Sequence, residues 1–378
     1  MKEYPIARPL ISKTGERGVL GVLRSGCLSL GPKLEEFEYK FKKMVGTKYA
    51  CAVSSGTAGL HLTMIAAGIG PGDEVITSPF SFIASSNAVL YVGAKPVFTD
   101  IDPVTYNMDP SKIEEKITPK TKAILVVHIF GQSAAMSPII KIAKKHKLKI
   151  IEDACESILA TYKGKNVGTF GESAVFAFYP NKQMTTGEGG MIVTNSKKIY
   201  KLCSSLRNQG RSSNIQWLDH KYLGYNYRMA EMNAALGISQ LAILGSLIEK
   251  RRKVAKLYER YLQKFAGMVE LPAVAKDNTH SWFVYVVRVK NPKIKRNNLI
   301  KLLAERGIAT KPYLPSIHLF SFYKELTGHR KGDFPISEMI SDTSLALPFY
   351  PGLGENDVKY ICRNVVEVLN NYEKQIQK

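Results

Sequence analysis

One loop of this sequence has the composition of an anion-binding site. Residues 54–60 read Ser-Ser-Gly-Thr-Ala-Gly-Leu and lie between an apolar run and a helical pattern. Small residues let backbone N–H groups approach an anion, hydroxyls add donors, and a helix N-terminus supplies positive potential. Ser55, Gly56 and Thr57 are therefore candidates for binding a phosphate group. Taken alone, a capped helix start explains the loop equally well, and the loop has neither the P-loop nor the dinucleotide-binding glycine motif.

Acidic residues follow a second apolar run. Ile150 and Ile151 lead directly into Glu152 and Asp153, and Glu156 follows three residues later. Because side chains alternate across a strand, Glu152 and Asp153 should point to opposite faces, so at most one of them faces a given ligand. Asp153, at the strand tip, could hold a protonated ring nitrogen. A helix N-cap or a solvated acid is the alternative interpretation.

A lysine follows a third apolar run. Residues 176–178 are apolar, Lys182 comes four residues later, and Gly-Glu-Gly-Gly at 187–190 leads into another apolar run. An amine held in a partly desolvated place has its charged form disfavoured, so it could attack a carbonyl carbon. Considered singly, Lys182 is one of many lysines, most of which are solvated.

These three loops need a scaffold that brings them together. Between residues 48 and 194, short apolar runs alternate with helical patterns. Runs that are apolar throughout are typical of strands covered by helices on both faces. The pattern predicts an α/β fold with a mostly parallel sheet, in which ligands bind at the carboxyl ends of the strands. The predicted strands are residues 49–54, 74–77, 95–100, 123–129, 148–152, 174–178 and 190–194, and a helix is predicted at 137–146.

The remainder of the chain predicts a long helix and a second region. From residue 229 to about 265, apolar side chains keep a three-and-four spacing, as in a helix that joins two domains. A strand at 283–289 and helices at 298–306 and 358–377 follow. We expect residues 1–250 to form a large α/β domain with an N-terminal segment, and residues 251–378 a small C-terminal α+β domain. The predicted buried stripe of the long helix is Val254, Leu257, Tyr258, Tyr261, Leu262 and Phe265.

Together and in this order, the three loops meet the needs of pyridoxal 5′-phosphate, which are a phosphate cradle, an acid for the ring nitrogen and a lysine. With these features the sequence resembles the DegT/DnrJ/EryC1/StrS family of sugar aminotransferases. The resemblance implies a type I fold of the PLP-dependent transferases, like that of aspartate aminotransferase. It extends over nearly the whole chain, and its most specific stretches are residues 54–60, 93–98, 151–157, 185–190 and 224–229.

The resemblance implies roles for the residues of the three loops. It makes Lys182 the Schiff-base lysine and Asp153 the partner of the pyridinium nitrogen. The backbone of Gly56 and Thr57, with the Thr57 hydroxyl and Ser55 beside them, would hold the cofactor phosphate.

The resemblance also assigns three residues outside these loops. Phe82 occupies the position of an aromatic ring stacked on the cofactor, and Asn226 that of a residue reaching the phosphate of the neighbouring subunit. A homodimer with shared active sites is therefore implied. Without the family match, a core aromatic and a turn residue would be the preferred interpretations of Phe82 and Asn226. His318 matches a segment near the substrate, and a ligand contact and a structural role are equally favoured for it.

Two residues depart from the family pattern. Ala177 stands where the family usually has a serine that donates to the phosphate, and this loss removes a hydrogen bond of about 1.5 to 3 kcal/mol unless another donor substitutes. Glu156 stands where glutamine is common, beside the phenolic oxygen of the cofactor. A carboxylate would repel a phenolate there. We therefore expect Glu156 either to be protonated or to be turned toward a sugar hydroxyl.

The implied activity is amino transfer from glutamate to the keto-sugar of a nucleoside diphosphate sugar, for cell-surface polysaccharide or glycoconjugate synthesis. Lysine at position 182 argues against the family branch of sugar dehydratases, which carry histidine there. A regulatory or nucleic-acid-binding protein on a PLP-enzyme scaffold is the alternative, because a fold does not by itself determine function. That alternative requires Lys182 to be dispensable.

The charge, the cysteine spacing and the length of the apolar runs narrow the kinds of partner that this chain could bind. The 53 lysines and arginines exceed the 32 acids, giving a net charge of +21. The basic clusters at 141–149 and 250–260 are broken by apolar residues, as on solvated helix faces, so no nucleic-acid partner is expected. Five scattered cysteines lack metal-site spacing, so no metal is expected. The longer apolar runs fall short of the roughly 20 residues that cross a membrane, and the N-terminus lacks a signal-peptide pattern. We expect a cytoplasmic enzyme without a membrane partner.

Overall fold

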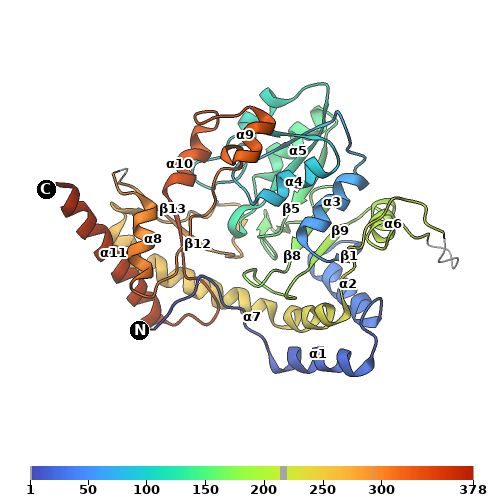
Figure 1. The fold of residues 1–378 in the computed structure, drawn as a ribbon, viewed down its shortest axis with the longest axis horizontal. Helices are drawn as coiled ribbons and strands as arrows, with labels where there is room; N and C mark the ends of the chain where they lie inside the picture. Colours follow the sequence, from blue (N-terminus) through green and yellow to red (C-terminus); the bar gives the residue numbers. More distant parts are fainter. Residues whose placement is uncertain (1, 213–218, 292, 378) are drawn as a thin grey trace.

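The computed structural model describes residues 2–212, 219–291 and 293–377, and its largest element is a seven-stranded sheet (Figure 1). The strand order is β1-β9-β8-β5-β4-β2-β3, and within these ranges only β9 runs antiparallel to its neighbours. Each strand lies within two residues of its predicted bounds, and the mostly parallel sheet is confirmed. The strands are β1 (Tyr49–Val53), β2 (Glu74–Thr77), β3 (Lys95–Phe98), β4 (Thr121–Val127), β5 (Lys149–Asp153), β8 (Ser173–Ala177) and β9 (Gly190–Thr194).

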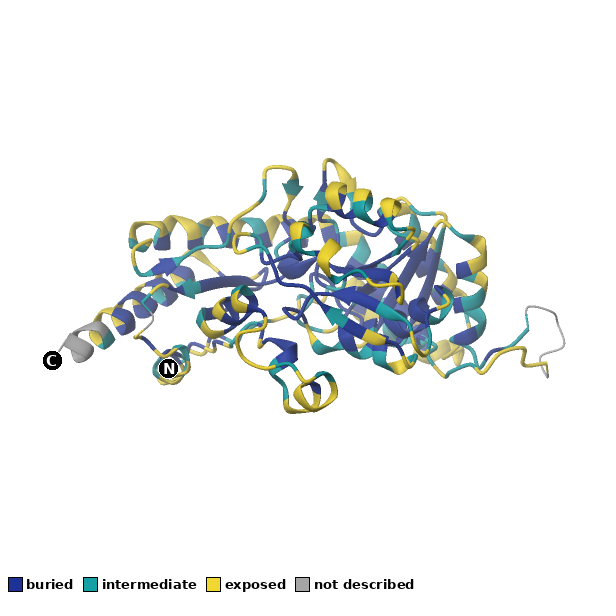
Figure 2. Ribbon diagram, turned by 90° about the horizontal axis from the view of Figure 1, so that it is seen from above, coloured by how far each residue is buried: buried dark blue, intermediate teal, exposed yellow. Residues whose placement is uncertain are grey.

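Helices cover both faces of this sheet. Along β8, Val175 belongs to the apolar core on one face and Phe176 to the core on the other. Figure 2 shows the strands as a buried interior with the exposed residues on the outer sides of the helices. Burial on both faces explains why several of the strands are apolar nearly throughout. One face packs against α3 (Gly56–Ala66), α4 (Ile83–Tyr91) and α6 (Lys197–Leu206), and the other against α2 (Pro32–Val45), α5 (Met136–Lys145) and α7 (Glu231–Leu262).

The long helix α7 contacts both parts of the chain. Its first half packs on α1 (Lys13–Ser25) and α2, and its second half packs on α11 (Glu355–Gln377). Val254, Tyr258 and Leu262 of the predicted stripe are buried, and the other three members are partly buried against the same core. The predicted long helix is therefore confirmed, and its apolar stripe forms one wall of the C-terminal core.

The same helix is the only described segment that is long and apolar enough to cross a membrane. With the short η4 (Gln263–Phe265) it covers Glu231–Phe265, and half of its most apolar stretch is buried inside the protein. It also carries the buried Arg251. A core helix of a soluble protein meets the same length and composition criterion, so this feature is weak evidence for a membrane span.

The C-terminal region contains a second, three-stranded sheet. It consists of β10 (Val269–Glu270), β12 (Tyr285–Val289) and β13 (Ser344–Leu347), packed against α8 (Arg296–Ala304) and α11. The predicted strand and helices are present with starts displaced by two or three residues. Tyr4 lies in this core, and its N–H donates to the carbonyl of Gly307. The first residues therefore pack against the C-terminal region, beside α11 (Figure 1).

Short elements complete the fold and have no clear sequence signal. A small sheet joins β6 (Thr161–Tyr162), β7 (Lys165–Asn166) and β11 (Asn278–Thr279) from distant parts of the chain. Two-residue strands are too short to show a hydrophobic period. The remaining elements are η1 (Pro110–Lys112), η2 (Glu114–Lys116), η3 (Ile129–Gly131), η5 (Ile317–Leu319), α9 (Ser321–Thr327) and α10 (Pro335–Thr343).

Candidate active site

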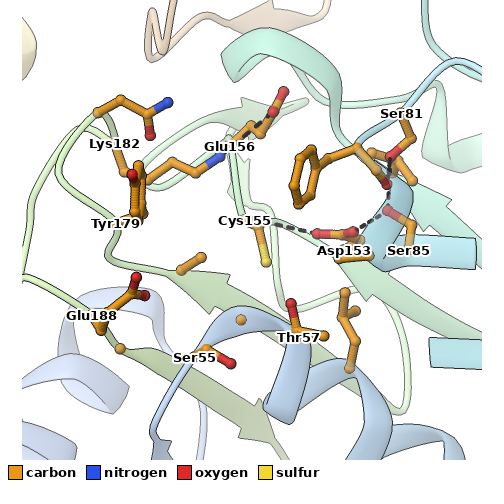
Figure 3. A pocket seen from close by; sticks show the side chains of 18 of the residues that line it. Ser55, Thr57, Ser81, Ser85, Asp153, Cys155, Glu156, Tyr179, Lys182 and Glu188 are labelled. Atoms are coloured by element: carbon orange, nitrogen blue, oxygen red, sulfur yellow. Dashed lines mark hydrogen bonds and ion pairs between the residues drawn. The ribbon is translucent and has the colours of Figure 1, made fainter. Parts of the chain in front are cut away.

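A cavity of about 660 Å³ lies at the carboxyl ends of β1, β5 and β8 (Figure 3). Its wall includes Ser54 after β1, Asp153 at the end of β5 and Ala177 at the end of β8. Tyr313 and Leu314, from the C-terminal region, line it as well. The three loops singled out in the sequence therefore meet in one place, because parallel strands deliver their carboxyl ends to the same edge of the sheet.

The first loop forms the N-terminus of α3. Ser55 is the N-cap, and its hydroxyl accepts from the N–H of Ala58 at 3.1 Å. The N–H groups of Gly56 and Thr57 belong to the first helical turn, where no intrahelical acceptor exists. Ser55, Gly56 and Thr57 all line the cavity. The loop thus directs free donors and the positive end of a helix toward the cavity.

Gly56 is required by close packing as well as by backbone approach. A Cβ atom at position 56 would lie 2.7 Å from the Cβ of Ala177 and 3.0 Å from the Sγ of Cys155. The methyl group of Ala177 is thus packed directly against the start of α3. A donor at position 177 would lie beside the free N–H groups, which is where the family serine was expected.

The carboxylate of Asp153 is held inside the cavity by two donors. The Ser85 hydroxyl donates to Oδ2 at 2.6 Å and the Cys155 N–H donates to Oδ1 at 3.1 Å. Ser81 lies 2.7 Å from the Ser85 oxygen, and since the single Ser85 hydrogen is directed at Asp153, Ser81 is the donor in that pair. Figure 3 shows these side chains on one side of the cavity. The chain of hydroxyls fixes the direction of the carboxylate.

Glu152 points to the opposite face, as strand alternation predicts. It is fully buried, and its carboxylate accepts from the backbone N–H groups of Gly168, Phe170 and Gly171 at 2.7 to 2.8 Å. His128 accepts from a backbone N–H through Nδ1, so its Nε2 carries hydrogen and donates to Glu152 at 3.0 Å. Glu152 therefore organises a loop behind the sheet and takes no part in the cavity.

Lys182 and Glu156 form an ion pair at the other end of the cavity. The Lys182 Nζ lies 3.5 Å from Oε1 of Glu156, and the two side chains are 13% and 8% exposed. Oε2 of Glu156 accepts from the N–H of Phe130 at 3.0 Å. Burial raises the pKa of the Glu156 carboxyl, and the nearby Lys182 ammonium and the Phe130 N–H oppose that rise only in part. The amine also lies 4.0 Å from the centre of the Phe283 ring.

The open side of the cavity carries aromatic side chains. Phe82 precedes α4, lines the cavity and is 61% exposed, which is unusual for a large apolar ring. Tyr313 lines the cavity near Glu156, and burial raises the pKa of its phenol. A flat molecule between these walls would cover the Phe82 ring.

The charges that line the cavity are mostly negative. Among the described lining residues, Asp153, Glu156 and Glu188 are acids and Lys182 is the only base. The large net positive charge of the chain therefore lies elsewhere. The described residues also contain no group of three or more histidine, cysteine, aspartate or glutamate side chains arranged to hold a metal ion.

Two predicted site residues lie outside the cavity of the single chain. Asn226 is exposed and pairs with Asn208 in an isolated β-bridge. His318 is fully buried, and its Nε2 lies 3.0 Å from Oε1 of Glu338. Its ring packs against Phe334. These contacts are those of a structural histidine.

Local sequence patterns do not predict several residues that line the cavity or contact Lys182. Ser81 and Ser85 are four residues apart at the start of α4, and that spacing after a strand end was an available but weak signal. Glu188 belongs to the glycine-rich turn noted in the sequence, without an assigned role. Tyr313 and Phe283 come from the C-terminal region, and nothing local in the sequence connects them with Lys182.

A family model, related sequences and solved structures all match this chain over most of its length. A model of the DegT/DnrJ/EryC1/StrS aminotransferase family matches residues 9–366. GDP-perosamine synthase of Caulobacter vibrioides is 40% identical over 342 residues, covering 90% of this chain and 91% of that protein. The spore coat polysaccharide biosynthesis protein SpsC of Bacillus subtilis is 37% identical over 377 residues, covering 97% of both. The structure of Spr1654 of Streptococcus pneumoniae in its PMP-form superposes with a TM-score of 0.94 at 27% identity, covering 100% of both chains.

Proposed function

This chain belongs to the DegT/DnrJ/EryC1/StrS family of PLP-dependent sugar aminotransferases, and on that premise we propose its substrates. The acceptor is the keto-sugar of a nucleoside diphosphate sugar, and the amino donor is glutamate. The product serves cell-surface polysaccharide or glycoconjugate synthesis, as the names of related proteins suggest. One observation carries the proposal, which is that a helix N-terminus, a buried carboxylate and a lysine share the walls of one cavity.

The residues of the cavity fit pyridoxal phosphate. The free N–H groups of Gly56 and Thr57 and the hydroxyls of Ser55 and Thr57 suit a phosphate group. The carboxylate of Asp153, held by two donors, suits a protonated ring nitrogen. The cavity volume falls in the range of small-molecule sites, about 300 to 1,000 Å³.

Each side chain then has a defined task. Phe82 would cover one face of the cofactor ring, and Lys182 would bond the cofactor covalently. When bound, the cofactor withdraws the electrons of the bond that breaks at the α-carbon of the donor. The Lys182 amine, once released, takes the proton from that carbon as a general base. Glu156, 3.5 Å from the amine, stabilises the ammonium that results. Its raised pKa also lets the carboxyl hold a proton itself.

The enzyme in this proposal is a homodimer with shared active sites. A substrate with two phosphates and a cofactor with one bring several negative charges, yet the described lining holds three acids and one lysine. Further donors must therefore come from outside these lining residues. Asn226 is exposed on one chain and available to a second copy, where it reaches the phosphate of the cofactor bound by the neighbouring subunit.

Further expectations belong to the same proposal. The chain divides near residue 250 into a large domain and a small one, within the long helix α7. The enzyme is cytoplasmic and has no nucleic-acid or membrane partner, and half of the most apolar stretch of α7 is buried inside the protein. His318 acts as a structural residue, because it is sealed from the cavity.

Trapping the cofactor tests the assignment of Lys182. Borohydride reduction of the PLP-loaded protein, followed by peptide mapping, should place the label on Lys182. Lys182→Ala should lose both the label and glutamate-dependent amino transfer to keto-sugar nucleotides, whereas Lys198→Ala, on the exposed face of α6, should keep both. A label on another side chain contradicts the proposal. Nucleic-acid binding that weakens steeply with salt and survives Lys182→Ala would favour the regulatory alternative.

A further inference from the structure

Arg251 is a buried cation that has no acidic partner among the described residues. It lies in the middle of α7, is 2% exposed, and burial lowers the pKa of its guanidinium to about 10. A buried charge is costly unless hydrogen bonds or an opposite charge compensate. The guanidinium donates instead to three backbone carbonyls: Nη1 to Trp282 at 3.4 Å and to Phe283 at 3.1 Å, and Nη2 to Lys182 at 3.1 Å.

Both segments held by Arg251 bear directly on the amine of Lys182. One is the peptide of Lys182 itself. The other is Phe283, whose ring centre lies 4.0 Å from the Lys182 Nζ. The N–H of Phe283 donates to the carbonyl of Phe130, and the N–H of Phe130 donates to Glu156, the ion-pair partner of the amine. Arg251 is therefore connected to the Lys182 side chain at both ends. It binds the Lys182 carbonyl directly, and through Phe283 and Phe130 it is linked to the groups that contact the Lys182 Nζ.

The surrounding backbone is packed too tightly to adjust freely. The residue after Lys182, Gln183, donates through Nε2 to the Glu156 carbonyl at 2.6 Å and to the Ser281 hydroxyl at 3.0 Å. A Cβ atom on Gly131 would lie 2.7 Å from the N atom of Trp282. The lysine loop and the 281–283 segment therefore move together if they move at all, and Arg251 joins both to α7.

We infer that Arg251 is a positioning residue for Lys182, and this inference rests on the role proposed above for that lysine. The planar fork of arginine presents donors in fixed directions to two different segments, which a lysine ammonium on a flexible stem does not do. Arg251 holds the Lys182 peptide and Phe283 at a constant distance from each other. In this way it determines the position of the amine between Glu156 and the cofactor. A misplacement of about 1 Å at a reacting group can cost about 10²-fold in rate.

Two variants test this role against a matched control. Arg251→Met removes the fork and its charge at similar length, and Arg251→Lys keeps the charge without the fork. The control is Arg296→Met, because Arg296 also donates to backbone carbonyls, those of Ser341 and Ser344, but lies in α8 of the C-terminal region. Thermal unfolding of the cofactor-free proteins measures the loss of stability in all three.

Two further measurements separate positioning from stability. The first is the kcat and KM for amino transfer, where both Arg251 variants should lose about 10²-fold in kcat with KM for the donor nearly unchanged. The second is the rate at which an amine-reactive reagent labels Lys182 in cofactor-free protein, followed by peptide mapping. That rate should rise in the Arg251 variants, because the amine is now only 13% exposed and paired. Arg296→Met should change neither quantity.

The inference is overturned if the Arg251 variants lose stability but keep kcat and the labelling rate of Lys182. It is also overturned if Arg296→Met changes both as much. Should Arg251→Met not fold, Arg251→Lys decides alone. Borohydride mapping of the unsubstituted enzyme keeps the two proposals apart, since a label elsewhere than Lys182 refutes the proposed function whatever the Arg251 variants do.

Discussion

Replacing Ser85 by alanine should slow amino transfer without weakening donor binding. The Ser85 hydroxyl donates to Oδ2 of Asp153 at 2.6 Å, is 1% exposed, and itself accepts from Ser81. A hydrogen bond to a charged group contributes about 1.5 to 3 kcal/mol. If Asp153 needs that bond to keep its direction toward the ring nitrogen, the loss corresponds to about a ten- to 150-fold fall in kcat.

Steady-state kinetics with glutamate and a keto-sugar nucleotide measures this effect, together with the dissociation constant for pyridoxal phosphate. Ser81→Ala is the graded control, because it removes a donor to Ser85 but leaves the bond between Ser85 and Asp153. Its kcat should fall less than that of Ser85→Ala. Thermal unfolding shows whether either substitution lowers the stability of the whole protein.

Two results would refute this reasoning. One is a Ser85→Ala enzyme with kcat close to that of the unsubstituted protein, which would mean that the Cys155 N–H alone holds Asp153. The other is a fall in the kcat of Ser81→Ala as large as that of Ser85→Ala. This would mean that turnover depends on the packing around the N-terminus of α4 rather than on the hydrogen bond to Asp153.

Two further substitutions test the departures from the family pattern. Ala177→Ser places a hydroxyl beside the free N–H groups at the start of α3, so the dissociation constant of pyridoxal phosphate should fall by about tenfold or more; an unchanged constant in a cofactor titration means that other donors already satisfy the phosphate. Glu156→Gln should alter the absorption spectrum of the cofactor-loaded enzyme or its substrate affinity, and no change in either contradicts a role for this carboxyl beside the cofactor. Because burial raises the pKa of Glu156, its stabilising contribution is full below about pH 4.5 and is lost as pH rises through the folded pKa. The stability of Glu156→Gln relative to the unsubstituted protein should therefore increase as the pH rises above about 4.5, as measured by thermal unfolding without cofactor.

Local sequence patterns predicted much of the large sheet and part of the site. The seven strands were predictable because strands buried on both faces are mostly apolar, and such runs stand out between helical patterns. Alternation along β5 was enough to separate Glu152 from Asp153. Parallel strands place their carboxyl ends at one edge, so the cradle, Asp153 and Lys182 could be expected to converge.

The short elements and the C-terminal walls of the cavity could not be predicted in this way. The strand pair of β6 and β11 joins residues more than a hundred positions apart, and each strand is two residues long. Tyr313 lines the cavity, and Phe283 contacts the Lys182 amine, only because the C-terminal region packs against the sheet domain. His318 resembles a substrate contact in sequence, and its burial beside Glu338 depends on that same packing.

The sequence by itself determined the order in which the functional residues occur along the chain: an anion-binding loop, then an acid, then a lysine, each after a buried strand. It could do so because periodicity and residue type are local properties. Only the tertiary structure decided what surrounds them. The hydroxyls that hold Asp153, the carboxylate and ring that flank Lys182, and the arginine that holds the lysine peptide come from separate segments. Contacts between distant segments depend on how whole elements pack, and no local pattern records that.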